Sequence, residues 1–326
     1  MIRIVLLLMS LWTSAGIAAS FDCSKARSNM EKAICGDKQL SHLDEELASV
    51  YKNARQKLSP ASSQILVSSQ RSWLRFNSTY CFIDINAGAV SVPEATRCLI
   101  HAYKDRIKGL ANTGQSLGPF KTFTAIDHHI RVTKEKDAVY IIQRTFTQVD
   151  DATPEGKSLN NYLSFKEKAN LPDERGTESY DVTLKHISPD WLYKQVFSET
   201  MTGAYPTSET ECGLFSIKQG RPLKVSDIFE GNAWKQVFAT MTKKHFLELA
   251  KKEKDFDITM VSASHLNATQ SSSPFSFCLN QKGIELVGFL PHVVRAYDGV
   301  TIAWHSLNHA LTPYAKEQVK KLLAIQ

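Results

Sequence analysis

The chain has 326 residues, of which 43% are hydrophobic and 22% are charged, and its formal net charge is +6. This length exceeds what one small core needs, so we expect two globular domains. The positive excess is mild and includes no run of like charges, which together with an export signal argues against a nucleic-acid-binding protein.

The first residues are typical of a secretory signal peptide. A basic start at Arg3 is followed by the apolar run IVLLLMSLW and by the small residues TSAGIAAS. We expect a signal peptide over residues 1–20, with cleavage after Ser20 or after Ala18. The apolar run is shorter than the roughly 20 residues of a membrane span. Cys23 follows Phe21-Asp22 and not small residues, so we expect no lipidation. No later segment is apolar for long enough to span a bilayer, so we expect no transmembrane segment. The mature protein is therefore expected in the periplasm or outside the cell.

All six cysteines lie in the mature part of the chain. An even number of cysteines in an exported protein indicates disulfides, although six cysteines allow 15 pairings. Short loops favour Cys23 with Cys35 and Cys81 with Cys98, which leaves Cys212 and Cys278 as a long-range pair.

Helical periodicity dominates residues 21–111. After a cysteine-bearing turn, apolar residues recur at three- and four-residue steps over residues 37–58, with Asp37 or Ser41 as the cap. Ser59-Pro60 predicts the start of a second helix, and Pro93 opens a third that reaches Leu110. A linker is expected at residues 112–120. The first domain is thus predicted as three antiparallel helices stapled by two disulfides, each contributing about 2–4 kcal/mol.

Residues 22–110 resemble the N-terminal domain of the LprI-type lysozyme inhibitors. The shared features are four cysteines, an E-K-x-I-C turn, an L-x-x-L-D-x-x-L helix, a Q-x-x-W-L helix and a C-L…Y-x-x-R helix. The resemblance implies a fold of disulfide-linked helices and a lysozyme-type muramidase as partner.

The second domain, residues 121–326, is expected to contain a largely antiparallel sheet. Strand-like alternation is found in residues 129–146, 159–172 and 179–200. Residues 211–229 predict two strands around a G-R-P turn. Residues 233–256 predict a helix, residues 274–307 a strand pair and a further strand, and the segment KEQVKKLLAI a closing helix. Strands and helices are segregated, which indicates an α+β fold.

Residues of about 180–310 resemble the extracellular C-terminal domain of the RsiV anti-sigma factor. The similarity is carried by the segments MTGAYP, FSIKQGRPLKVSDIF and FSFCLNQKGIELVGFLPHVVRAYDGVTIAW. Tyr205 stands where the family often has histidine, and Leu290-Pro291 where an aromatic residue is common. In RsiV this domain binds lysozyme as a sensor, so both halves of the chain point to lysozyme binding.

Neighbouring carboxylates on the first helix do not form a catalytic pair. Asp44, Glu45 and Glu46 are adjacent, so their side chains face different directions and cannot flank one bond. We interpret them as a solvated face, with Asp44 partly packed and paired with an arginine such as Arg75.

The histidines could be metal ligands and the tryptophans could be platforms for a bound ligand. His305 and His309 have a metal-like spacing, but Pro313 and the preceding strand argue against a helix there. His128 and His129 are neighbours in a strand and point to opposite faces. Trp73 and Trp304 lie on apolar stripes and are expected in the core.

No nucleophile elbow, phosphate loop or free cysteine is found in the sequence. We therefore expect no enzyme activity, no catalytic residue, no metal and no cofactor. Three functions remain: a lysozyme-binding or lysozyme-inhibiting protein, an envelope scaffold that binds peptidoglycan or another protein, and an enzyme with an unrecognised site. Many host lysozymes are strongly basic, so the first function requires an acidic patch. The candidates are Asp37, Asp44 and Glu45, or the turn at Asp150-Asp151.

Overall fold

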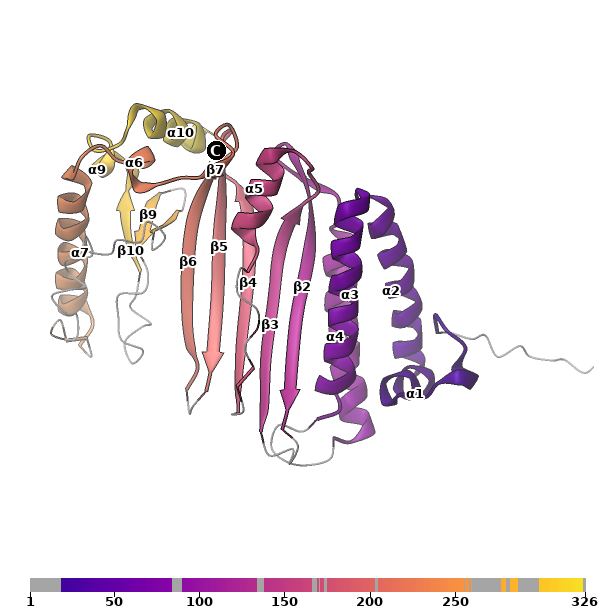
Figure 1. Ribbon diagram of the computed structural model, residues 1–326. Helices are drawn as coiled ribbons and strands as arrows, with labels where there is room; N and C mark the ends of the chain where they lie inside the picture. The colour runs from indigo at the N-terminus through magenta and orange to yellow at the C-terminus, as the bar shows by residue number, and fades with distance from the viewer. Residues whose placement is uncertain are drawn as a thin grey trace, which may run out of the picture.

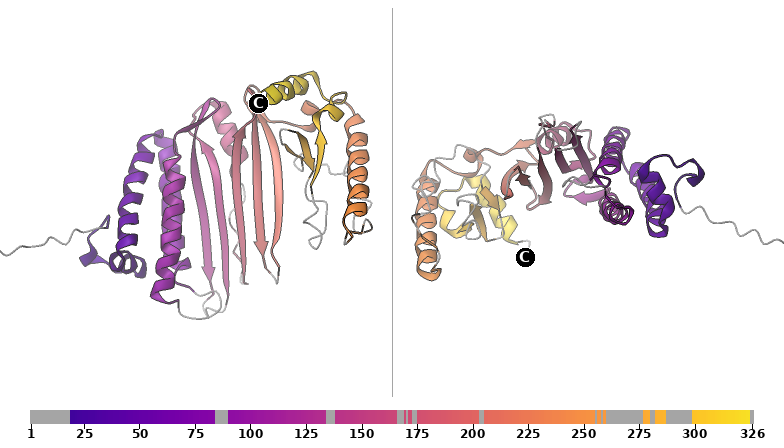
Figure 2. Two further views of the ribbon diagram at one scale, coloured as in Figure 1. Left: turned by 180° about the vertical axis from the view of Figure 1, so that it is seen from behind. Right: turned by 90° about the horizontal axis from the view of Figure 1, so that it is seen from below.

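The computed structural model describes residues 19–83, 90–133, 138–165, 175–202, 205–254, 277–279, 282–286 and 299–324, and residues 169, 171, 172, 256, 257 and 259. Most of the expected signal peptide, residues 1–18, lies outside this part. Among the helices of the described residues, none has both the length and the apolar character needed to cross a membrane. A group of helices, a large sheet and a smaller sheet with helices follow one another along the chain (Figures 1 and 2), which confirms the α+β class.

The N-terminal region is helical. Its elements are η1 (Cys23–Lys25), α1 (Asn29–Gly36), α2 (Lys38–Gln56), α3 (Pro60–Tyr80) and α4 (Val92–Ala111). The three predicted helices are confirmed as α2, α3 and α4. The predicted cysteine-bearing turn instead contains the additional helix α1, because Ser28 and Glu31 form a capping box that starts it. Disulfides join Cys23 to Cys35 and Cys81 to Cys98.

Capping residues fix where these helices begin. The Asp37 carboxylate accepts a hydrogen bond from the Leu40 amide at 2.9 Å, so Asp37 caps α2. Ser41, the other candidate, lies inside α2 and donates to the Ile34 carbonyl. Ser59 caps α3 and Pro60 occupies its first turn, as the sequence predicted.

The core of the helical region encloses a buried carboxylate. Trp73 and Tyr103 meet edge to face with ring centres 5.0 Å apart. The Tyr103 hydroxyl donates to Asp44 at 2.9 Å, and the Ser20 amide and hydroxyl also donate to this carboxylate. The predicted pairing of Asp44 with Arg75 is therefore wrong. The Asp44 carboxylate instead accepts from three donors, which are the Tyr103 hydroxyl and the amide and hydroxyl of Ser20.

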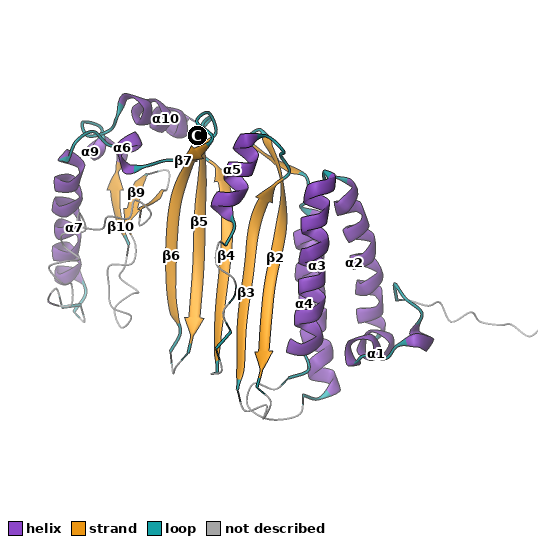
Figure 3. Ribbon diagram, in the orientation of Figure 1, coloured by secondary structure: helices purple, strands orange, loops and turns teal. Residues whose placement is uncertain are grey.

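Seven strands form the large sheet in chain order. They are β1 (Gln115–Leu117), β2 (Phe120–Val132), β3 (Val139–Val149), β4 (Gly176–His186), β5 (Trp191–Met201), β6 (Thr207–Ser216) and β7 (Arg221–Pro222). All neighbours are antiparallel except β3 and β4. That parallel pair needs a crossover, which contains α5 (Pro154–Leu163) and lies across one face of the sheet (Figure 3). We call this face the α5 face.

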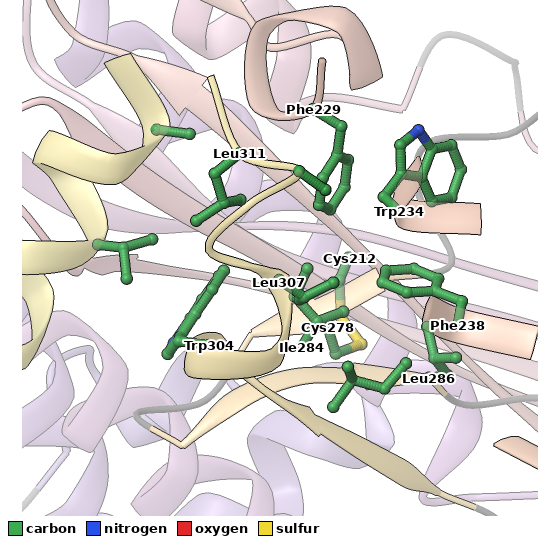
Figure 4. Packing of buried hydrophobic residues seen from close by; sticks show 14 of the residues in the cluster. Cys212, Phe229, Trp234, Phe238, Cys278, Ile284, Leu286, Trp304, Leu307 and Leu311 are labelled. Carbon is green, nitrogen blue, oxygen red and sulfur yellow. A yellow bond between two sulfur atoms is a disulfide. The ribbon is translucent and has the colours of Figure 1, made fainter. Parts of the chain in front are cut away.

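The C-terminal region forms a second core. Its elements are α6 (Val225–Ile228), α7 (Ala233–Lys252), β8 (Phe277–Leu279), β9 (Gly283–Leu286), β10 (Val300–Ala303), α9 (Trp304–Leu307) and α10 (Pro313–Ala324). Buried side chains from these elements and from β5 and β6 form one cluster, in which Phe238, Leu307 and Ile302 are almost fully buried (Figure 4). The disulfide between Cys212 and Cys278 links β6 to β8 inside this cluster.

Two strand predictions are wrong. Residues 159–163, expected in a strand, belong to α5, because Leu159 and Leu163 are one helical turn apart and both enter the core on the α5 face. The second strand expected within residues 211–229 is reduced to the two residues of β7. The next residues form α6, which the Asp227 carboxylate holds by accepting from the Lys224 amide. The expected linker, residues 112–120, contains β1 and the turn into β2.

Helix α3 covers the outer edge of β2. Strand β1 pairs only with residues 120–122, so among the described residues the rest of β2 has no strand neighbour on that side. The Ser69 hydroxyl accepts from the Ile126 amide at 2.8 Å. The Ser72 hydroxyl accepts from the His128 amide and donates to its carbonyl, both at 2.9 Å. Serine side chains of α3 thus make the hydrogen bonds to β2 that a neighbouring strand would otherwise make at Ile126 and His128.

Removing this edge cover should destabilise the protein. Ser72→Ala leaves the amide and the carbonyl of His128 without their partner, so we expect a loss of about 1–3 kcal/mol in the free energy of unfolding. Urea denaturation measures this. Ser78→Ala is the control, because that exposed hydroxyl bonds only within its own helix, to the Arg75 carbonyl; it should change stability by less than about 0.5 kcal/mol. Equal losses in both variants would contradict the edge-capping role.

The buried ring of His128 predicts sensitivity to acid. Burial, reinforced by the charge of Arg106, lowers the pKa of His128 from 6.5 to about 3. The unfolded chain therefore takes up a proton that the folded chain does not, and stability present above pH 6.5 is lost as the pH falls toward 3. The ceiling is about 5 kcal/mol. His128→Leu should flatten this part of the stability curve, whereas His309→Leu at an exposed position should not. Parallel curves for wild type and His128→Leu would refute the assignment.

Candidate functional site

The acidic residues proposed from the sequence have structural roles. Asp44 is buried in the helical core and Asp37 caps α2. Burial raises the pKa of the Asp150 carboxyl, but the hydroxyl and the backbone amide of Ser59, at the start of α3, donate to it and hold its pKa below the usual value. Asp151 accepts from Thr153 at the start of α5. Of this group, only Glu45 is exposed with no such bond among the described residues.

The histidines and tryptophans proposed from the sequence form no metal cluster within the described residues. His305 lies in the short helix α9, and His309 follows it. Within the described ranges, no three His, Cys, Asp or Glu side chains gather in a way that could hold a metal ion. His129 bonds Asp127 at 2.8 Å, whereas His128 is turned to the other side of the strand. Trp73 and Trp304 are buried in the two cores.

An acidic stretch that the sequence analysis missed lies in the hairpin of β5 and β6. Residues 195–211 contain three glutamates and no lysine or arginine, in a chain whose net charge is +6. Glu199, Glu209 and Glu211 are exposed. Both strands run to the end of the sheet opposite α10 (Figure 1). We call residues 195–211 the acidic hairpin.

Exposed apolar side chains accompany these carboxylates. Phe197 is 45% exposed, Met201 46% and Tyr205 76%. Alternation along β5 places Phe197, Glu199 and Met201 on the face opposite α5. Glu209 and Glu211 pair across the strands with Ser198 and Val196, and therefore lie on the α5 face. The acidic hairpin thus presents carboxylates on both faces and a large apolar surface on one.

On the α5 face, the hairpin borders an open groove of about 1070 Å³. Rings and charges line it, including Tyr162, Phe165, Tyr180, Arg144, Lys194 and Glu211. Lys194 donates to the Tyr162 carbonyl at 3.0 Å and lies over the Tyr162 ring at 4.4 Å. Burial, and then the charge of Glu211, raise the pKa of Tyr162. We call this space the sheet groove.

The other end of the sheet groove is cationic and aromatic. The Arg144 guanidinium lies 4.9 Å from the ring centre of Phe165 and 3.6 Å from the Asp127 carboxylate. The hydroxyl of Tyr180 donates to Glu178 at 2.9 Å, and together with burial this contact raises the pKa of Tyr180. Aromatic faces beside fixed charges suit the binding of a polar chain or of a protein loop.

Comparisons with known proteins give a family match for the helical region. The model of the family described as lysozyme inhibitor LprI matches residues 23–110. This region agrees with the one in which the sequence resembles that family, and it contains the first two disulfides.

Two solved structures of the DUF3298 family are similar to part of the chain. A DUF3298-family member from Bacteroides fragilis is 14% identical, with a TM-score of 0.48, and covers 64% of this chain and 100% of its own. A DUF3298-family protein from Pseudomonas aeruginosa is 13% identical, with a TM-score of 0.41, and covers 60% and 96%. No curated protein matches significantly. Part of the segments behind the RsiV resemblance lies outside the described residues, namely residues 203–204, 275–276, 280–281 and 287–298.

Proposed function

We propose that this chain is an exported, non-enzymatic binding protein of the bacterial envelope and that its partner is a lysozyme-type muramidase. The observation that carries the proposal is the match of residues 23–110 to the lysozyme inhibitor LprI family. The resemblance of residues 180–310 to the lysozyme-sensing domain of RsiV supports it independently. We propose residues 21–111 and 121–326 as the two domains, joined by residues 112–120.

Three disulfides support export, because such bonds persist in oxidising compartments. The signal-peptide pattern of residues 1–20 supports the same location, periplasmic or secreted.

The acidic hairpin is the surface that we propose for contact with a basic muramidase. A protein with a net charge of +6 is repelled by a basic partner at long range, so attraction has to come from a local acidic region. The hairpin combines three carboxylates with exposed Phe197, Met201 and Tyr205. Aromatic residues and methionine are enriched in protein interfaces. Glu199 lies on the same face as Phe197 and Met201. The other two glutamates add negative charge on the α5 face, and together the three carboxylates favour a basic partner.

A second candidate is an envelope scaffold that binds peptidoglycan or another envelope protein. The sheet groove favours it, because aromatic rings beside charges suit glycan and peptide chains. Retention of the purified protein on isolated cell wall, lost at high salt, would support this function.

The first test measures binding of the oxidised mature protein to hen lysozyme and to a bacterial muramidase, at low and high salt, with a wall-lysis assay. We expect sub-micromolar binding that weakens at high salt, because salt screens exposed charges. The triple variant Glu199→Gln/Glu209→Gln/Glu211→Gln should bind about tenfold more weakly.

The matched control is Glu230→Gln/Glu248→Gln/Glu253→Gln, which removes three exposed carboxylates outside both the hairpin and residues 23–110 and should bind like the wild type. Binding without loss of lysis would indicate a sensor or scaffold. If the wild type binds neither enzyme, the proposed function is wrong. If both triple variants bind equally well, the hairpin is not the contact surface.

A further inference from the structure

A second cavity lies where the helices meet the sheet. It has a volume of about 500 Å³ and is bounded by α3, α4, β2 and β3. The rings of Trp73, Phe76 and Tyr80 form its apolar wall, and Gly109 and Thr145 also line it. This volume is within the range of small-molecule sites in proteins. We call it the junction cavity.

A buried cation without a counter-ion borders the junction cavity. Arg106 is only 2% exposed. Its Nε donates to the Gln70 side chain at 2.8 Å and its Nη2 donates to the Ser69 hydroxyl at 3.2 Å, and both acceptors are neutral. No carboxylate pairs with Arg106 among the residues that the structure describes. Burial of a charge is costly unless it is paired, and it lowers the pKa of Arg106 to about 10.

His128 adds an unsatisfied donor to the same wall. Both ring nitrogens are buried and make no hydrogen bond within the described part of the chain. The ring contacts Phe76 edge to face at 5.1 Å. At neutral pH the imidazole is uncharged and carries one N–H, which in a folded protein normally has an acceptor.

The remaining ionisable groups of the wall lie at its rim. Asp105 and His101 line the cavity but are exposed, so water solvates them. The interior therefore combines apolar rings with one cation and one neutral donor. This combination is complementary to a molecule with an apolar body and a single anionic acceptor.

We propose that the junction cavity binds a small organic carboxylate, with its ring or short alkyl body against Trp73 and Phe76 and its carboxylate toward Arg106 and His128. Guanidinium and carboxylate make strong charge-assisted hydrogen bonds, and the ligand would neutralise the only buried charge of the wall. The site is distinct from the acidic hairpin and from the sheet groove, since it involves neither β5 nor β6.

The test uses benzoate and 3-phenylpropionate as probes, and benzyl alcohol and 3-phenylpropanol as neutral counterparts. Tryptophan fluorescence reports on the cavity through Trp73, and thermal unfolding reports on stabilisation of the full-length mature protein. We expect saturable binding of at least one acid and at least tenfold weaker binding of its alcohol. The NMR signal of the His128 ring should shift on addition of that acid.

A filled cavity provides the matched control. A Cβ added at Gly109 meets no atom within 4 Å, so Gly109→Leu should fold, and it replaces a helical glycine with a better helix former. Its side chain would occupy the cavity and abolish binding of the acids. Gly36→Leu, at a helical glycine with the same open space but outside the cavity, should bind like the wild type.

Three results would overturn the proposal. If neither acid binds, the cavity holds only solvent. If acids and alcohols bind equally, Arg106 and His128 do not recognise an anion. If Gly109→Leu binds as well as Gly36→Leu, the ligand lies elsewhere.

Discussion

The edge of β2 that faces a helix instead of another strand is the constraint on which the arrangement of this protein depends. A strand edge with free amide and carbonyl groups must find partners or it recruits another chain. Here Ser69 and Ser72 of α3 provide those partners for Ile126 and His128. Because the partners are side chains of a helix, the helical region is fixed in one register against the sheet. The buried ring of Phe123 then joins the helical core.

The same serines explain why polar groups are buried at this junction. Ser69 accepts from the Ile126 amide and also from Arg106, so one hydroxyl serves both the strand and α4. Ser72 bonds the backbone of His128, and both Arg106 and His128 line the junction cavity. The two serines that cover the strand edge therefore also position the polar groups of the candidate ligand site.

Local sequence patterns predicted most helices and strands correctly, but they could not predict contacts between residues far apart in the chain. The Ser59-Pro60 start of α3 and the alternation in residues 179–200 concern neighbours in sequence, and both are confirmed. The strand expected at residues 159–172 was wrong for residues 159–163, which form part of α5. Leu159 and Leu163 pack against distant strands, and local alternation cannot indicate that contact. Ser69 and Ser72 resembled a solvated helix surface, since no pattern in the sequence announces that a strand edge will lie against them.

The candidate sites show the same division between local and distant information. Asp37 and Asp151 are short acidic residues near helix starts, where such residues are typical caps, and both bond local groups there. Asp150 instead bonds the distant Ser59 at the start of α3, a contact that no local pattern in the sequence indicates. The glutamates of the acidic hairpin alternate with small polar residues, which is also the pattern of an ordinary solvated strand. The available signal was the absence of lysine and arginine over residues 195–211 of a basic chain. The hairpin lies at the far side of the sheet from the helices that match the inhibitor family (Figure 1), so the two regions present different surfaces to a partner. Variants in each region therefore separate the two halves of the lysozyme hypothesis.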